Sequence, residues 1–178
     1  MITLACAVAI VGALCVLDLL LTFGVVRRLR EHTALLGRMQ PSAGLGIGLS
    51  AGETPEPFTV TNTEAVTMQG PAGLGVVAFF STTCPLCPKR VPAFIDYVRA
   101  HPVTRDEVLV VIAGESAESV PYLADLAEVA RVSFEPSRGP VSQGFAVKGV
   151  PAFFVLNAAG AILASGHDAA ALPVPARA

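Results

Sequence analysis

One stretch decides the fold of this 178-residue chain: Gly75-Val76-Val77-Ala78-Phe79-Phe80-Ser81-Thr82-Thr83-Cys84-Pro85-Leu86-Cys87. Its first six residues form an unbroken apolar run, which is typical of a central strand covered on both faces. Its last four residues are two cysteines separated by two residues. The stretch therefore predicts a pair of thiols at the end of a buried strand.

The residues after the cysteines alternate between helical and strand-like patterns. Val91, Phe94, Ile95 and Val98 recur at the spacing of one buried helical stripe, and this helix should end before Pro102. We then expect, in chain order, a buried strand at Val108–Ala113, a helix at Val120–Ala130, a short edge strand at Val132–Phe134, a short helix at Pro140–Ala146, and a hairpin of Ala152–Leu156 with Ala161–Ala164. This order predicts an α/β sheet with helices on both faces.

The segments around this core differ from it in composition. Residues 1–26 carry a single charge and are long enough to cross a bilayer, so we expect a transmembrane helix. A cleaved signal peptide is the alternative, but a basic n-region is missing and Arg27-Arg28 follows where a cleavage site should be. We expect residues 27–57 to be a juxtamembrane helix and flexible linker, 58–168 the folded domain, and 169–178 a disordered tail.

The overall composition excludes two classes of protein. Twelve Lys and Arg against fourteen Asp and Glu give a net charge of −2, which leaves no basic field to hold the phosphates of a nucleic acid. Hydrophobic residues make up 53% of the chain and charged residues 15%, so the chain as a whole is not disordered.

Cys84 and Cys87 are the usable pair among four cysteines, because Cys6 and Cys15 lie in the apolar N-terminal run. At the start of a helix, their spacing places the sulfurs one turn apart, close enough to form a disulfide. The positive end of the helix dipole favours a thiolate at the first cysteine. Since a thiolate is the species that attacks a disulfide, Cys84 is the predicted nucleophile and Cys87 the resolving thiol. Pro88 should distort the first helical turn.

Two other roles for the cysteine pair stay open. A structural disulfide has the same spacing, although closing so short a loop gains little stability. A structural zinc site needs four ligands, but there is no second cysteine pair, and His32, His101 and His167 are scattered. We therefore expect a redox-active pair with no metal and no cofactor.

The motif and its surroundings resemble the thioredoxin-like thiol-disulfide oxidoreductases of the membrane-anchored TlpA type. The resemblance rests on the apolar strand before the two cysteines, on Pro92, and on Gly149-Val150-Pro151 ahead of Ala152-Phe153-Phe154-Val155. It implies a thioredoxin-like fold with a central mixed sheet, and enzymatic disulfide exchange with a protein client. It also implies a role for each of five residues: Pro92 as the kink proline of the active-site helix, Pro151 as a cis-proline facing the cysteines, Val150 as a backbone contact for the client, and Pro85 and Leu86 as supporting residues.

A closer resemblance is to the thioredoxin-like accessory protein of methylamine utilisation, which has an N-terminal membrane helix and a Cys-Pro-x-Cys site. Arg38–Leu45 and Gly52–Phe58 resemble its linker and the start of its domain, so the likeness covers nearly the whole chain except the tail. It implies a Cys-rich secreted client without identifying it.

The chain departs from the family pattern at three positions. Ala78 stands where thioredoxin has a buried acid, Thr83 where a tryptophan usually precedes the first cysteine, and Arg90 where many reductases of this type carry glutamate. Cys87 therefore has no evident local base, while Lys89 and Arg90 add charge that favours a thiolate. These differences predict a disulfide that is a better oxidant than that of a reductase.

Two rival functions use a similar fold. Peroxiredoxins need a Thr or Ser three residues and a proline seven residues before the reactive cysteine; Ser81 fits this pattern and Val77 does not. A non-enzymatic copper or haem-thiol carrier would have wider cysteine spacing and a histidine near Val150-Pro151. A second cysteine so close to the first suits disulfide exchange better than either rival.

Two rules conflict over the side of the membrane. Arg27, Arg28 and Arg30 favour a cytoplasmic domain by the positive-inside rule. Disulfide donation needs an oxidising compartment, so we expect a single-pass protein of the cell membrane with an extracytoplasmic domain. Its expected partners are a Cys-containing protein client and a membrane redox partner. Asp18 either contacts another membrane protein, or is protonated or snorkels to the interface.

Overall fold

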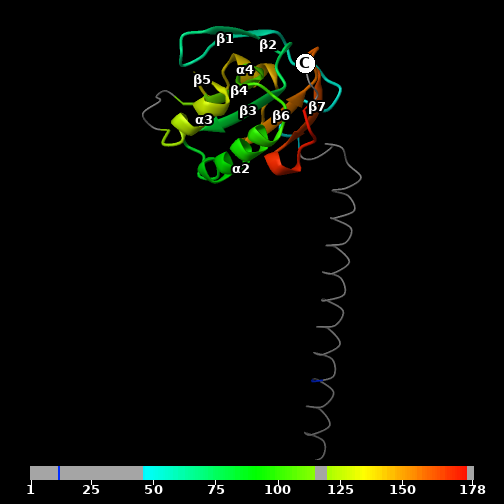
Figure 1. Cartoon of the computed structure of the whole chain (residues 1–178). Helices are drawn as coiled ribbons and strands as arrows, with labels where there is room; N and C mark the ends of the chain where they lie inside the picture. Colours follow the sequence, from blue (N-terminus) through cyan, green and yellow to red (C-terminus); the bar gives the residue numbers. More distant parts are fainter. Residues whose placement is uncertain (1–11, 13–45, 115–119, 176–178) are drawn as a thin grey trace, which may run out of the picture. The chain divides into compact units, whose positions relative to one another are not determined.

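The computed structural model describes Gly12, residues 46–114 and residues 120–175. Its central sheet has five strands in the order β5-β4-β3-β6-β7 (Figure 1). The strands are β3 (Val76–Ser81), β4 (Val108–Ala113), β5 (Arg131–Glu135), β6 (Ala152–Leu156) and β7 (Ile162–Gly166). Strands β3, β4 and β5 are parallel, whereas β6 is antiparallel to both β3 and β7. The sheet is therefore mixed.

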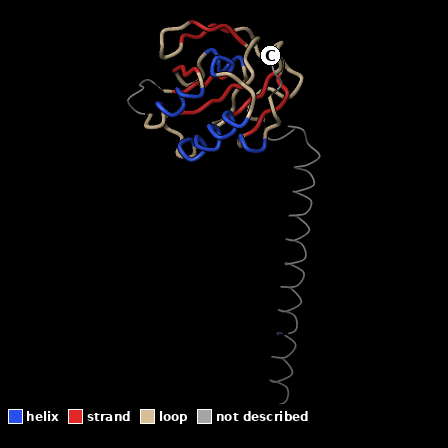
Figure 2. The backbone as a smooth tube through the Cα atoms, in the orientation of Figure 1, coloured by secondary structure: helices blue, strands red, loops and turns tan. Residues whose placement is uncertain are grey.

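Helices cover both faces of this sheet (Figure 2). Within the described residues they are α2 (Cys87–Ala100), α3 (Leu123–Val129) and α4 (Pro140–Gly144), with 3-10 turns η1 (Arg105–Glu107) and η3 (Ala169–Ala171). Residues of α2 and α3 belong to the core on one face, and residues of α4 belong to the core on the other. The predicted α/β architecture is confirmed.

The central strand β3 is covered from both sides, as its apolar run predicted. None of its residues from Val76 to Phe80 is more than 1% exposed. Because side chains alternate along a strand, Ala78 and Phe80 face α2 and α3, whereas Val77 and Phe79 face α4. Because both faces of β3 are packed, the strand is held in position. The end of the strand, from which the chain continues to the cysteines, is therefore fixed as well.

Phenylalanine side chains fill both cores. On the α2 side, the ring of Phe94 stacks on Phe153 with the centroids 5.5 Å apart, and Phe80 meets Phe94 edge-on. On the α4 side, the ring of Phe145 lies 5.3 Å from that of Phe79. Aromatic pairs in such geometries add about 0.5–1.5 kcal/mol to the burial of their area. Both helical layers are thus tied to the middle of the sheet.

The second predicted helix is shorter than its sequence pattern indicated. It was expected over Val120–Ala130, but α3 begins at Leu123. The N–H of Leu123 bonds back to the C=O of Val120, so a tight turn precedes the helix. The turn buries Tyr122, which a regular helix starting at Val120 would orient differently.

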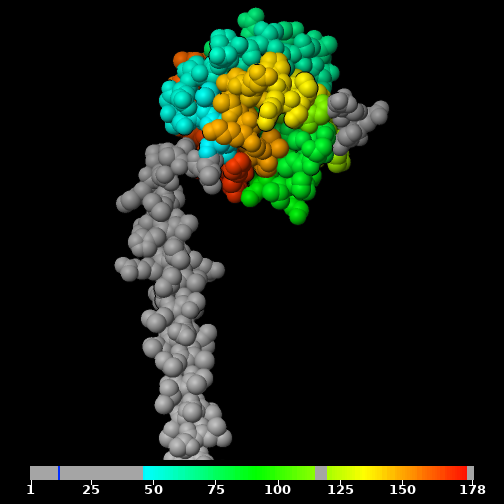
Figure 3. Space-filling model, turned by 180° about the vertical axis from the view of Figure 1, so that it is seen from behind, coloured from blue at the N-terminus to red at the C-terminus, as the bar shows by residue number. Residues whose placement is uncertain are grey.

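Residues 46–57 pack against the domain, so the prediction that they belong to a flexible linker is wrong (Figure 3). Ile47 is 7% exposed, and its C=O accepts the N–H of Lys148 at 2.8 Å. A Cβ atom on Gly48 would stand 2.5 Å from the backbone oxygen of Phe145. The small residues that are typical of a linker here allow a close approach between backbones, and the folded domain begins before Phe58.

A second sheet was not predicted. It is an antiparallel hairpin of β1 (Phe58–Thr61) and β2 (Thr67–Gly70), in which exposed residues alternate with buried or half-buried ones, so neither strand has an apolar run. Glu64 in its connecting turn forms ion pairs with Arg105 and Arg131. The hydrogen bond from the Arg105 guanidinium is the main cause that lowers the pKa of Glu64. Charge pairs therefore tie the hairpin turn to the main domain.

The prediction of a disordered tail from Ala169 is wrong for residues 169–175. Ala169 is 2% exposed in η3, and the hydroxyl of Tyr97 donates to the C=O of Pro173 at 2.6 Å. The small alanine side chain lets this segment lie close against α2. Ala169 thus belongs to the core, although most of the Ala- and Pro-rich residues that follow it are exposed.

The predicted transmembrane helix over residues 1–26 lies outside the described residues except for Gly12, and so does most of the predicted juxtamembrane segment. Among the residues that the structure does describe, no helix has both the length and the apolar character needed to cross a bilayer.

We predict that Ile47→Ala lowers the free energy of unfolding by about 2–4 kcal/mol, because it removes buried methyl groups from a closely packed core. Chemical denaturation of the full chain measures this change. Val174→Ala is the matched control, since Val174 is 61% exposed and its truncation should change stability little. An Ile47→Ala variant as stable as the control would show that this segment does not contribute to the fold.

Candidate dithiol active site

The two cysteines follow β3 on a series of tight turns. The C=O of Ser81 accepts the N–H of Cys84, and the C=O of Cys84 accepts the N–H of Cys87, both at 3.2 Å. The C=O of Leu86 accepts the N–H of Lys89 at 3.1 Å. Each bond spans three residues rather than the four of an α-helix, so the cysteine segment is wound tightly onto the end of the central strand.

Helix α2 begins at Cys87, so the placement of both cysteines at the helix start holds for the second only. A residue before proline is biased away from helical φ and ψ, and Pro85 imposes this bias on Cys84. Pro88 lies in the first turn of α2, where its missing N–H removes no intrahelical hydrogen bond. Helix α2 runs without a break from Cys87, and Leu86 before it also has helical φ and ψ, so the tight turns that precede the helix, and not Pro88, make its entry irregular.

The two thiols differ in accessibility. Cys87 is completely buried and packs in the core with α2, whereas Cys84 is half-buried. The residues between them are exposed, and Leu86 is 56% exposed. Both cysteines are free thiols, joined by a hydrogen bond between their side chains. An incoming polypeptide therefore meets the sulfur of Cys84 first.

The environment of Cys87 keeps its thiol protonated at neutral pH. Burial raises the pKa of Cys87 to about 12, and the hydrogen bond to Cys84 and the negative charge of Cys84 act in the same direction. A backbone hydrogen bond at Ser81 opposes this shift. Since thiolates are the species that attack disulfides, the Cys87 thiol is a poor nucleophile in this state.

Tyr122 is a site residue that sequence reasoning missed. Its side chain is 9% exposed, and its ring centroid lies 6.3 Å from that of Phe80. Burial raises the pKa of Tyr122, and the negative charges of Cys87 and Cys84 raise it further. The phenol thus lies within electrostatic reach of both sulfurs. Its position before α3 depends on helix packing, which no local motif records.

The Val150–Pro151 loop lies against the first cysteine. Its peptide bond is cis, as is that between Gly70 and Pro71. The carbonyl oxygen of Val150 accepts a hydrogen bond from Sγ of Cys84 at 3.7 Å. Pro151 is buried and Val150 half-buried. The two motifs that the sequence singled out are therefore in contact, although 66 positions separate Cys84 from Val150.

A third segment reaches the same place and was also missed. Nδ1 of His167 lies 2.6 Å from the carbonyl oxygen of Pro151. Its neighbour Asp168 accepts a hydrogen bond from Arg90 of α2 at 3.0 Å. Arg90 was expected to act on the cysteines, but its charge is paired with this carboxylate. In the sequence, His167 stands out only as one of three scattered histidines that do not complete a zinc site.

A groove of about 500 Å³ runs along α2 beside the dithiol. Its lining is mainly apolar and proline-rich, from Pro88, Val91, Pro92, Ile95, Pro121 and Tyr122, with Asp96, Arg99 and Asp125 completing it. Pro92, the predicted kink proline, lies inside α2 and is exposed to this groove. Neither cysteine lines the groove; Pro88, the residue after Cys87, is its lining residue nearest to them in the sequence.

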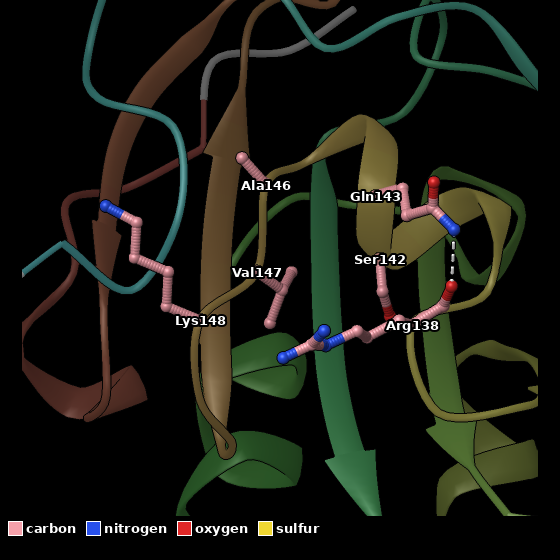
Figure 4. Close-up of a pocket in the computed structure, with 6 residues that line it drawn as sticks. All are labelled: Arg138, Ser142, Gln143, Ala146, Val147 and Lys148. Atoms are coloured by element: carbon pink, nitrogen blue, oxygen red, sulfur yellow. Dashed lines mark hydrogen bonds between the residues drawn. The ribbon is translucent and has the colours of Figure 1, made fainter.

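A second cavity, of about 600 Å³, lies beside α4 (Figure 4). Arg138 and Lys148 are among its lining residues, and the Gln143 amide donates to the backbone carbonyl of Arg138 at 2.6 Å. Val147 in its lining packs in the core on the face of the sheet away from the cysteines. The cavity is therefore separate from the dithiol.

No metal-ligating cluster was found among the residues that the structure describes. No group of three or more His, Cys, Asp or Glu side chains in these residues is arranged to hold a metal ion.

Comparison with known proteins places the fold. No protein-family model matches the chain, and no curated protein matches it. Solved structures do match. The thioredoxin domain of a thiol-disulfide oxidoreductase from Bacteroides vulgatus has a TM-score of 0.55 at 16% identity, covering 68% of this chain and 94% of that one.

Two further structures give the same result. A thio-disulfide isomerase from Thermus thermophilus has a TM-score of 0.54 at 18% identity, covering 67% of this chain and 87% of that chain. A thiol:disulfide interchange protein from Bacteroides sp. has a TM-score of 0.53 at 16% identity, covering 68% and 85%. The three structural neighbours are a thiol-disulfide oxidoreductase domain, a thio-disulfide isomerase and a thiol:disulfide interchange protein, and the likeness to them is one of fold.

Fold and site together define a class of protein: an α/β domain with a central mixed sheet and a Cys-x-x-Cys pair at the end of its central strand. Its fold is the thioredoxin-like fold.

We predict that iodoacetamide at pH 8 modifies Cys84 and leaves Cys87 unmodified in the folded, reduced protein, because Cys87 is buried and protonated. Mass spectrometry in a Cys6→Ser/Cys15→Ser background measures this difference. In Cys84→Ser, where burial remains, we expect Cys87 to react about 100-fold more slowly than in denatured protein. Equal rates at the two cysteines in the folded protein would contradict the assignment of roles.

Proposed function

We propose that this protein is a membrane-anchored thiol-disulfide oxidoreductase that exchanges disulfides with a protein client. One observation carries the proposal: the half-buried Cys84 sulfur contacts both the buried thiol of Cys87 and the carbonyl of Val150. A disulfide exchanger needs one accessible sulfur, a second sulfur beside it, and polypeptide backbone available for a client. The likeness in fold to solved oxidoreductases supports the same conclusion.

The reaction has two steps in the reducing direction. The Cys84 thiolate attacks one sulfur of a client disulfide, forming a mixed disulfide and releasing the other client sulfur as a thiolate. Cys87 then loses its proton and attacks the Cys84 sulfur, which breaks the mixed disulfide and releases the second client thiolate. Two electrons pass to the client, both client thiolates take up protons, and Cys84 and Cys87 end as a disulfide. The reverse sequence oxidises a client dithiol.

The client is an extended polypeptide segment that carries a cysteine. The N–H of Val150 makes no hydrogen bond with any residue that the structure describes, so it is available to a client backbone. The exposed Leu86 offers an apolar contact beside the reactive sulfur. Pro85 and Pro92 support this surface, since one shapes the turn between the cysteines and the other lines the adjoining groove.

The anchor and the compartment are part of the proposal. The resemblance to membrane-anchored TlpA-type proteins, and to the methylamine-utilisation accessory protein, supports residues 1–26 as a single transmembrane helix. Disulfide exchange as a donor favours an extracytoplasmic domain. In that compartment, a membrane redox partner would regenerate the dithiol or the disulfide after each turnover.

We predict that the reduced wild-type protein accelerates reduction of insulin disulfides by dithiothreitol, measured as turbidity. Cys84→Ser should lower this rate at least about 100-fold, because the nucleophile is lost. Cys87→Ser should accumulate a mixed disulfide with the substrate, seen as a mass adduct that dithiothreitol removes. A wild-type protein that consumes peroxide but does not exchange disulfides would instead establish the peroxidase alternative.

The reduction potential of the Cys84/Cys87 couple gives the direction of exchange. Equilibration with glutathione buffers, read by alkylation and mass, measures it. A potential of about −120 mV identifies a disulfide donor, and one of about −270 mV identifies a reductant. The departures from the family pattern at Ala78 and Arg90 favour the donor.

Membrane anchoring and orientation have their own test. We predict that the full chain sediments with membranes, and that a membrane-impermeant maleimide labels Cys84 in intact spheroplasts of a bacterial expression host. A Cys84→Ser variant controls for labelling at other sites. Labelling only after lysis would place the domain in the cytoplasm and contradict the proposed orientation.

A further inference from the structure

We propose that His167 is a positioning residue of the dithiol site, which holds the Val150–Pro151 loop in place for the client. This inference rests on the proposed function, because the loop matters only if a client binds there. The residue lies directly after β7, and none of the motifs in the sequence includes it.

The hydrogen bond at Pro151 is the first observation. Nδ1 of His167 lies 2.6 Å from the carbonyl oxygen of Pro151. A carbonyl oxygen only accepts, so Nδ1 carries the hydrogen and donates it. The geometry therefore fixes the role of this ring nitrogen and leaves Nε2 for other contacts.

Two consecutive carbonyls of the loop are held in this way. The carbonyl of Val150 accepts a hydrogen bond from Cys84, and that of Pro151 accepts one from His167. After Pro151 the chain enters β6, where Ala152 pairs with Phe79. Before Val150 the chain is exposed at Gly149. The imidazole thus holds the loop at the point between the rigid strand and the residues that a client would contact.

The segment that carries His167 is itself fixed to the active-site helix. Asp168 accepts a hydrogen bond from Arg90 at 3.0 Å and, through its other oxygen, one from the N–H of Ala170 at 3.2 Å. Ala169 is buried against α2, and Tyr97 of α2 bonds to Pro173. Figure 1 shows this segment, in red, beside α2. Two adjacent residues therefore contact the two sides of the site: His167 contacts the Val150–Pro151 loop, and Asp168 contacts helix α2.

The ion pair contributes less to this arrangement than the imidazole does. The side chains of Arg90 and Asp168 are 45% and 44% exposed, and exposed pairs of this kind are weak and screened by salt. His167 is itself exposed, but the carbonyl that it holds belongs to Pro151, which is buried and is followed by the completely buried Ala152. We therefore place the positioning role on His167.

The experiment compares His167→Ala with His167→Asn in the insulin assay, using the full chain. Asparagine places an amide N–H the same number of bonds from Cα as Nδ1, so it can keep the hydrogen bond. We expect His167→Ala to raise KM for the protein substrate about three- to tenfold with kcat changed less than about twofold, and His167→Asn to stay within about twofold of wild type.

His101→Ala is the matched control. Nδ1 of His101 also lies 2.6 Å from a backbone carbonyl, that of Tyr97, but at the far end of α2, about 20 Å along the helix from Cys87. We expect no change in KM for this variant. Reduction of the Cys84–Cys87 disulfide by dithiothreitol should proceed at the wild-type rate in all variants, because a small thiol does not need the loop.

Each outcome is decisive. A His167→Ala variant with wild-type KM overturns the positioning role and leaves the proposed function intact, as does a His167→Asn variant as impaired as His167→Ala. An equal rise in KM in His101→Ala would show general destabilisation instead. A wild-type protein without disulfide exchange overturns both proposals. If His167→Ala does not fold, His167→Gln, whose amide lies one methylene further out, replaces it as the variant expected to be impaired.

Discussion

The burial of β3 on both faces is the constraint on which the site depends. The strand lies between a parallel and an antiparallel neighbour, and the rings of Phe79 and Phe80 are packed into opposite cores. A strand held in this way cannot slip in register without exposing one of its apolar faces. The tight turns that follow Ser81 therefore hold the cysteines at a fixed position relative to the sheet. The Val150–Pro151 loop then forms the other side of the site.

The same burial makes the two sulfurs differ in accessibility. The turn over Pro85 and Leu86 leaves Cys84 at the rim, and the first residue of α2 points into the core. One thiol is thus open to a polypeptide while the other is shielded by the helix that it begins. This asymmetry follows from where the helix starts.

Sequence reasoning located the elements with strong periodicity and missed those without it. The apolar run of β3 and the stripe on α2 are dictated by burial, which leaves a pattern in the residues themselves. The β1–β2 hairpin is partly exposed, and residues 46–57 are held by backbone contacts that small side chains permit, so neither leaves such a pattern.

The site could be predicted in part for the same reason. Its cysteines and the Val150–Pro151 loop stand out as motifs. Tyr122 and His167 do not, because their contacts depend on how α3 and the β6–β7 hairpin are placed in space. From its position in the chain, Arg90 was expected to act on the cysteines. Its ion pair with Asp168 instead depends on how the chain around residue 168 folds back on α2, which the composition of this segment does not indicate.

The high pKa of Cys87 poses a chemical problem that the reaction itself relieves in part. Ala78 supplies no proton acceptor, and in the resting site both the hydrogen bond to Cys84 and the charge of Cys84 hold the proton on Cys87. Once Cys84 is joined to a client, its sulfur carries no negative charge and is a much poorer hydrogen-bond acceptor. Both of these contributions then weaken, while burial, the largest cause, still raises the pKa of Cys87 against the backbone hydrogen bond at Ser81. In the proposed exchange, formation of the mixed disulfide therefore relieves part of the problem, and loss of the Cys87 proton still has to overcome the burial of the thiol.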